Sequence, residues 1–272
     1  MHATAHPVTD TPPLIRRNEG PVAVLTLSRP EIRNCLSEET IRALTETMDD
    51  IAQDKNIRAV VLAAEGSVFS SGHDLKEMTA HRADEDDGRA FYSFIMRQCS
   101  AMMQKIITLP QPVIAAVEGV ATAAGCQLVA TCDLAIAGED ARFCTPGVNL
   151  GLFCSTPSVA LSRNLSRKHA LEMLLTGEMT GAADALRFGL VNRIAPRGEA
   201  LAQAMELARK IAAKSSRAVA AGKRAYYAQI EMPLAEAYDH ASQVMVENML
   251  AFSAREGIEA FLQKRPPDWR GG

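Results

Sequence analysis

The chain has 272 residues, of which 47% are hydrophobic and 22% are charged. This balance excludes an intrinsically disordered protein, and the length allows one large domain with or without a helical appendage. The formal net charge of −3, without a basic tract, excludes a protein that binds nucleic acid through its overall charge. No apolar run approaches the ~18 residues of a membrane-spanning helix. We therefore expect neither nucleic acid nor a membrane as a partner.

The first twenty residues contain no apolar segment of the kind that secretory signals need. Arg16 and Arg17 would suit a mitochondrial presequence, but Asp10, Glu19 and three prolines do not. The sequence therefore predicts a cytoplasmic protein in which residues 1–19 form a flexible lead-in.

Six cysteines and six histidines are scattered along the chain without the spacing of metal ligands or of a Cys-x-x-Cys motif. Scattered thiols in a cytosolic chain are mostly buried and chemically silent. We expect no metal site.

The first half of the chain alternates between strand and helix patterns. Residues 22–27 are β-rich and end before Pro30, whereas residues 59–64 are apolar on both faces, as in a central strand. Between them, Ser37 can cap a helix that runs to about residue 53, with Glu38 and Glu39 in its first turn. Residues 65–74 read as a loop. The later elements are a helix at 91–109, a strand at 112–118, a helix at 123–131 and a strand at 133–137. This order predicts a layered α/β sheet.

Strand patterns nearly vanish after about residue 161. The helices predicted there lie at 169–175, 181–188, 199–213, 216–229, 234–252 and 255–263, with one short strand at 190–194. No linker rich in Gly or Ser separates the two halves. We therefore expect an α/β core over residues 20–195 and a helical region over 196–272 that packs on the core and on neighbouring subunits.

Two stretches carry a recognisable pattern. Residues 68–78 read VFSSGHDLKEM, and residues 112–128 read PVIAAVEGVATAAGCQL, followed by CDLAIA at 132–137. Together they resemble the signature of the crotonase (enoyl-CoA hydratase/isomerase) superfamily, and residues 176–191 and 257–265 resemble its later segments. The likeness spans roughly residues 20–268. The loop around residue 73 and the segment 149–155 resemble the branch called enoyl-CoA hydratase domain-containing protein 3.

The resemblance implies a crotonase-like spiral of repeated β-β-α units with a C-terminal α-helical trimerisation region. It also implies an acyl-CoA thioester as substrate, with coenzyme A as part of that substrate and no separate cofactor. A homotrimer or a dimer of trimers is expected. The late helices carry more apolar residues than one core needs, and large apolar surfaces usually meet another subunit.

Enzymes of this superfamily pass through an enolate or oxyanion at the thioester oxygen, which preorganised backbone N–H groups stabilise. By resemblance, the two donors are the N–H groups of His73 and Ala124. Gly72 can free the backbone before His73, and Ala124 can begin a helix whose first N–H groups lack intrahelical acceptors. The small residues around Ala124 could instead serve only for tight helix–sheet packing.

The resemblance also places the CoA moiety. The residues implied in binding it are Arg29, Ser70, Gly72, His73, Asp74, Leu75, Lys76, Ala124 and, from a neighbouring subunit, Lys264. Asp74 reads more like a helix cap than an acid.

One departure from the family is informative. Hydratases of this family use two glutamates as proton carriers, and the resemblance places Gln127 and Gly147 in their positions. Three interpretations stay open. The first is an acyl-CoA or enoyl-CoA enzyme with another catalytic group, the candidates being Cys126, Cys154, Ser155, Glu118 and His73. The second is a weak enoyl-CoA hydratase of fatty-acid metabolism in which Gln127 orients water. The third is a non-catalytic acyl-CoA-binding protein.

Overall fold

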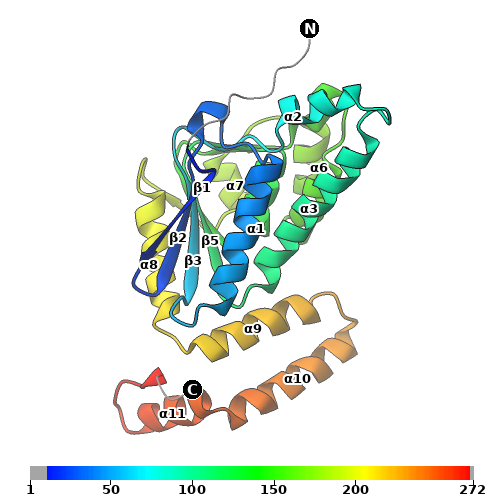
Figure 1. Ribbon diagram of the computed structural model, residues 1–272. Helices are drawn as coiled ribbons and strands as arrows, with labels where there is room; N and C mark the ends of the chain where they lie inside the picture. The colour runs from blue at the N-terminus through cyan, green and yellow to red at the C-terminus, as the bar shows by residue number, and fades with distance from the viewer. Residues whose placement is uncertain (1–10, 270–272) are drawn as a thin grey trace.

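The computed structural model describes residues 11–269 of the chain. Figure 1 shows two parts: an α/β core, and a helical arm that leaves the core and runs beside it. A flexible lead-in was predicted for residues 1–19, of which residues 1–10 lie outside the described residues. For residues 14–19 the prediction is wrong, because they form strand β1 and pair with β2.

A large sheet carries the core. Its strand order is β1-β2-β3-β5-β7-β10, and every neighbouring pair is parallel except β1 with β2. The strands are β1 (Leu14–Glu19), β2 (Val22–Leu27), β3 (Ala59–Ala64), β5 (Val113–Val117), β7 (Leu134–Gly138) and β10 (Arg193–Ala195).

A smaller sheet lies at the carboxyl ends of these strands. It has the order β4-β6-β8-β9, and its strands are β4 (Val68–Ser70), β6 (Val120–Thr122), β8 (Arg142–Cys144) and β9 (Thr180–Gly181). The chain adds one strand to the large sheet and the next to the small sheet, three times in succession, with helices between. This confirms the predicted spiral of β-β-α units. Strand β4 was missed, because residues 65–74 had been predicted to be a loop.

Helices cover both faces of the large sheet (Figure 1). Those of the core are α1 (Glu38–Gln53), α2 (Leu75–Ala80), α3 (Arg89–Thr108), α4 (Ala124–Thr131), α5 (Ser155–Asn164), α6 (Arg167–Thr176), α7 (Ala182–Phe188) and α8 (Ala200–Ala212), with 3-10 turns at Pro30–Ile32, His81–Ala83 and Pro146–Leu150. Successive residues of β2 point to opposite faces: Val24 joins the cluster under α8, whereas Leu25 joins the cluster that contains α1 and α3. Burial on both faces explains the continuous apolar pattern of the central strands.

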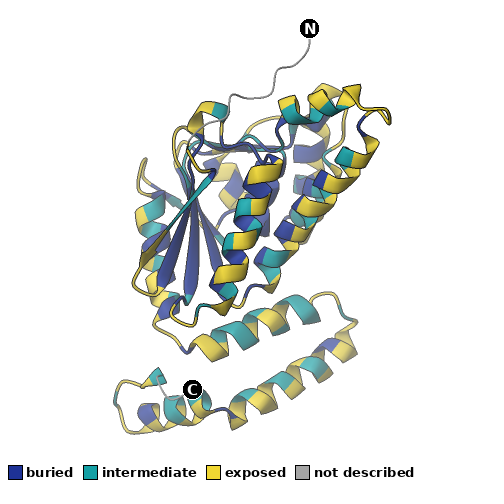
Figure 2. Cartoon of the chain, viewed as in Figure 1, coloured by how far each residue is buried: buried dark blue, intermediate teal, exposed yellow. Residues whose placement is uncertain are grey.

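The arm consists of α9 (Ser216–Gln229), α10 (Leu234–Leu250) and α11 (Phe252–Leu262). These helices bury little within the chain: α9 has no buried residue, α10 has Ala237 and α11 has Ala260. Figure 2 shows the arm coloured mainly as intermediate or exposed, in contrast to the sheet. Large apolar side chains, including Leu234, Phe261 and Leu262, are exposed along it.

One buried polar network joins the arm to the core. Lys223 of α9 donates from Nζ to the Asp133 carboxylate at 2.7 Å and to the carbonyl oxygens of Ile106 and Gln111. The hydroxyl of Tyr227 donates to the other oxygen of Asp133 at 3.0 Å. Burial raises the pKa of Asp133 and lowers that of Lys223, and their mutual attraction opposes both shifts. Removing one partner would therefore leave an uncompensated buried charge.

Replacing Lys223 with methionine should cost about 3–5 kcal/mol of unfolding free energy, the loss typical of a broken buried ion pair. Urea denaturation would measure it, with Lys214→Met as the control because Lys214 is exposed at the end of α8. A loss below about 1 kcal/mol, as for an exposed pair, would show that the network does not hold the arm.

Within residues 11–269, no helix is both long and apolar enough to cross a membrane. The same residues contain no group of three or more His, Cys, Asp or Glu side chains placed to hold a metal ion.

Candidate active site

The first predicted donor, the His73 N–H, lies three residues after the end of strand β4. Gly72 has a φ of +83°, which glycine adopts without strain. A Cβ on Gly72 would lie 2.9 Å from the Ala124 nitrogen and 2.9 Å from the Ala123 Cβ. The loop before His73 therefore packs directly against the second predicted donor. The His73 N–H has no hydrogen-bond acceptor within the described chain.

The second donor, the Ala124 N–H, begins helix α4 directly after strand β6. Helix starts leave their first N–H groups without intrahelical acceptors, and no acceptor for this one lies within residues 11–269. A Cβ on Gly125 would lie 2.3 Å from the Ser70 carbonyl oxygen, so only glycine lets α4 approach β4 this closely. The spiral thus brings two free donors together at the carboxyl ends of adjacent parallel strands.

The residue before the second donor is strained. Ala123 has φ 50° and ψ −121°, a region that residues other than glycine rarely adopt, and its own N–H donates to the Cys144 carbonyl at 2.9 Å. A side-chain methyl causes no strain at the helical Ala124, but it does at Ala123. Strain of this kind costs about 1–3 kcal/mol.

Replacing Ala123 with glycine should raise the unfolding free energy by about 1 kcal/mol, because relief of strain exceeds the ~0.4–1 kcal/mol of added unfolded-state entropy. Chemical denaturation would measure the change. The same substitution at exposed Ala101, in the middle of α3, should instead cost about 1 kcal/mol. Destabilisation at both positions would refute the assignment of strain.

Two side chains near the donors, the half-buried His73 and the buried Gln127, have covered polar atoms without a hydrogen bond of good geometry. These atoms are the two ring nitrogens of His73, which have only the Leu36 backbone nearby, and Oε1 of Gln127, a residue that is 4% exposed. Burial lowers the pKa of His73, which favours the neutral imidazole. Gln127 lies one turn after Ala124 on α4. Unsatisfied buried groups are rare in proteins and mark places where a ligand or water completes the bonding.

Most of the predicted CoA-binding residues lie around the His73 N–H. Ser70 is fully buried and its hydroxyl accepts from the Gly72 N–H at 3.3 Å. Asp74 caps α2, accepting from the N–H groups of Lys76 and Glu77, which confirms the prediction of a cap. Leu75 and Lys76 are exposed on the first turn of α2. All of them surround the first donor.

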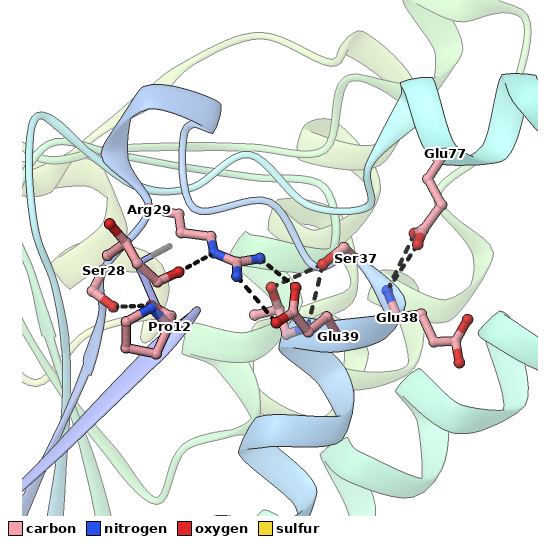
Figure 3. Close-up of polar contacts among 9 residues, drawn as sticks. Pro12, Ser28, Arg29, Ser37, Glu38, Glu39 and Glu77 are labelled. Carbon is pink, nitrogen blue, oxygen red and sulfur yellow. Dashed lines mark hydrogen bonds and ion pairs between the residues drawn. The ribbon is translucent and has the colours of Figure 1, made fainter. Parts of the chain in front are cut away.

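Arg29 and Lys264 are placed differently. Arg29 is 9% exposed, and its guanidinium donates to both oxygens of Glu39, at 2.6 and 3.1 Å, and to the Thr11 carbonyl (Figure 3). These bonds engage it in a structural ion pair instead of leaving it free for a phosphate. Lys264 follows α11, and Figure 1 shows α11 at the opposite end of the molecule from α2. Lys264 therefore does not reach the site within this chain.

The alternative catalytic candidates lie in different environments. Glu118 accepts from the Ala200 N–H at 2.9 Å and so caps α8, away from the donors. Ser155 is exposed and bonds to the Phe153 carbonyl. Cys126 is fully buried, and burial raises the pKa of its thiol. Cys154 is half-buried beside Gly147, a contact that no sequence signal indicates because seven residues separate the two.

Residues 17–272 match the family model of enoyl-CoA hydratase/isomerase. The chain belongs to this family, as the paired donor loops and the spiral indicate. It is 46% identical to the mouse protein "Enoyl-CoA hydratase domain-containing protein 3, mitochondrial", over 93% of this chain and 83% of that protein. The crystal structure of the human protein of that name superposes with a TM-score of 0.89 at 45% identity, over 94% of this chain and all of that one. A crystal structure of an enoyl-CoA hydratase from Mycobacterium smegmatis superposes with a TM-score of 0.90 at 50% identity, over 95% of this chain and 99% of that one.

These likenesses confirm the family and branch predicted from the sequence. They contradict the predicted cytoplasmic location, because the mouse and human relatives are named mitochondrial. That prediction rested on a few acidic residues and prolines before residue 20, which do not by themselves exclude a mitochondrial presequence.

Proposed function

We propose that this protein acts on acyl-CoA or enoyl-CoA thioesters and stabilises a thioester enolate with the backbone N–H groups of His73 and Ala124. The observation that carries the proposal is the close contact between the two donor loops. A Cβ on Gly72 would lie only 2.9 Å from the Ala124 nitrogen. Two free N–H groups in a buried site are suited to a developing oxyanion, because they need no reorganisation during the reaction.

In the proposed site, this chain lacks the two glutamates that carry protons in hydratases of the family. Gln127 and Gly147 stand in the two glutamate positions, and neither can exchange a proton at neutral pH. Gln127 can still orient a water or a thioester, since its Oε1 is buried and free. The site therefore polarises a thioester well and adds water poorly.

The CoA moiety is proposed to lie over Ser70, Gly72, His73, Asp74, Leu75 and Lys76. Coenzyme A is then part of the substrate, and no separate cofactor is required. The exposed Lys76 can reach a phosphate, and Lys264 can do so from a neighbouring subunit. Arg29 would contribute only indirectly, by fixing the start of α1 through Glu39.

We further propose a homotrimer or a dimer of trimers, assembled through the arm. A shallow hollow of about 380 Å³ on α10 is lined by Met245, Val246, Met249 and Leu250 with Ser242. Large apolar side chains, including Leu234, Phe261 and Leu262, are exposed elsewhere along the arm, and extended apolar surfaces usually meet another subunit. Analytical ultracentrifugation at micromolar concentration should show three or six chains, and a monomer would contradict the proposal.

A panel of acyl-CoA and enoyl-CoA thioesters tests the function directly. Thermal stabilisation with turnover of one class supports the enzyme and names its substrate. Stabilisation without any turnover supports a non-catalytic acyl-CoA-binding protein instead. If no thioester raises the melting temperature, the proposed site is wrong.

A further inference from the structure

A cleft opens between the core and the start of the arm. It has a volume of about 460 Å³, and its walls are the end of α1, the loops that lead into β3 and β5, the first turns of α9 and the side chain of Trp269. The indole Nε1 of Trp269 donates to the Ala213 carbonyl at 3.0 Å, which fixes the ring in its wall.

The cleft lies at the opposite edge of the large sheet from the candidate active site. Its loops precede β3 and β5 and so meet the amino ends of these parallel strands, whereas the His73 and Ala124 N–H groups lie beyond the carboxyl ends. Figure 1 accordingly shows α9 and α2 at opposite ends of the core. A molecule in the cleft would therefore not compete with one at the two donors.

The cleft is positively charged. Lys55, Arg58 and Arg217 line it, and none of them forms an ion pair with a carboxylate of residues 11–269. Asp54 also lines the cleft, but its carboxylate accepts from Arg16 Nη2 at 3.1 Å, so its charge is already compensated. Three cations are therefore left for an anion.

The N-terminus of α9 adds to this charge. The helix begins at Ser216, which lines the cleft together with Arg217. The first N–H groups of a helix have no intrahelical acceptor, and the helix dipole makes this end positive. Phosphate groups commonly bind at such helix ends.

A buried acceptor in the same cleft lacks a partner. Gln111 lines the cleft and is 8% exposed. Its Nε2 donates to the carbonyls of Ile51 and Ile57 at 2.9 and 3.2 Å, and these two bonds fix the orientation of the amide. Oε1 is thereby left buried without a hydrogen-bond partner. Such atoms are rare in proteins, and this one needs a donor from outside the chain.

We propose that this cleft binds a nucleoside phosphate. The phosphate complements the N-terminus of α9 and the three cations, and a ribose hydroxyl or a base N–H supplies the donor that Gln111 Oε1 lacks. Trp269 offers the aromatic surface on which bases usually stack. The volume lies within the ~300–1,000 Å³ of small-molecule sites, and an inorganic anion would leave most of it empty. The site takes no part in the thioester chemistry and so stands apart from the proposed function.

Isothermal titration calorimetry of the wild type with AMP tests the proposal. AMP should bind once per chain. Adenosine and ribose 5-phosphate should each bind at least ~10-fold more weakly, because one lacks the charge and the other lacks the base. Arg217→Glu should weaken AMP at least ~10-fold, since a charge-assisted hydrogen bond is replaced by repulsion. Gln111→Leu should weaken it as well, and its melting temperature shows whether the core stays folded.

Two charge reversals serve as controls. Arg224 is exposed on the same helix two turns further on and is outside the cleft lining, so Arg224→Glu should bind AMP like the wild type. Lys76→Glu, at the candidate active site, should also leave AMP binding unchanged.

The contrary outcomes are distinct. If the wild type binds no AMP, or if Arg217→Glu binds it as tightly as the wild type, the cleft is not the site. Loss of AMP binding in Lys76→Glu alone would place AMP in the CoA region and overturn the inference. If ribose 5-phosphate binds as tightly as AMP, the base is not recognised and the ligand class is wrong. The proposed function stands in each case, because acyl-CoA binding is measured separately.

Discussion

Replacing Gly72 with alanine should slow turnover by about two to three orders of magnitude and weaken thioester binding while the protein remains folded. The new Cβ would lie 2.9 Å from the Ala124 nitrogen and 3.1 Å from the Thr122 carbonyl oxygen, so it would cover one donor and push the two loops apart. Loss of one preorganised donor typically costs ~10²–10³-fold in rate. Turnover of the best thioester of the panel, together with thermal stabilisation by it, would measure the effect.

A matched control separates occlusion from backbone strain. Gly198 has a φ of +78°, close to that of Gly72, but a Cβ there would have nothing within 4 Å. Gly198→Ala should therefore lose only the stability that the positive φ costs, less than Gly72→Ala loses, and keep full activity. Equal activity of the two alanine variants would show that the contact between the donor loops has no catalytic importance.

Hydration of crotonyl-CoA should be ~10²–10⁴-fold slower than in a hydratase that carries both glutamates, because a positioned general acid or base contributes about that much. The two N–H donors would leave a residual rate, since polarisation of the carbonyl does not require the carboxylates. Loss of the conjugated thioester absorbance measures it. Rapid hydration by the wild type would show that another residue activates water.

Restoring the carboxylates requires a third change. The sequence suggests that Gln127→Glu with Gly147→Glu should raise hydration, but a side chain at 147 would collide with the Cys154 Sγ. We therefore expect the double variant to stay slow and the triple variant with Cys154→Ala to hydrate faster. If the double variant alone gains activity, the loop from 147 to 154 adapts more easily than its hydrogen bonds indicate.

Much of the fold was predictable because local chemistry and tertiary structure agree. Ser37 caps α1 as predicted, accepting from the Thr40 N–H, and the apolar run at 59–64 is the buried strand β3. The two donors are predicted from motif resemblance, and the structure adds that their loops pack together and that neither N–H has an acceptor within residues 11–269. Strand β4 was missed because three residues carry too little pattern.

The remaining differences arise from contacts between distant segments. The pairing of Arg29 with Glu39 depends on how the loop after β2 meets α1, which the motif that suggested Arg29 as a CoA-binding residue does not show. The strain at Ala123 depends on ψ, which sequence does not reveal. The meeting of Gly147 with Cys154 depends on the path of an irregular loop. Each became visible only with coordinates.

The arm has a consequence for how this protein behaves on dilution. Helices α9–α11 have hardly any core of their own and are tied to the rest of the chain by the network around Lys223. If a second copy supplies the missing apolar contacts, folding of the arm and association are one equilibrium governed by mass action. The melting temperature would then rise with protein concentration, and the arm would be the first segment exposed to proteases when subunits separate.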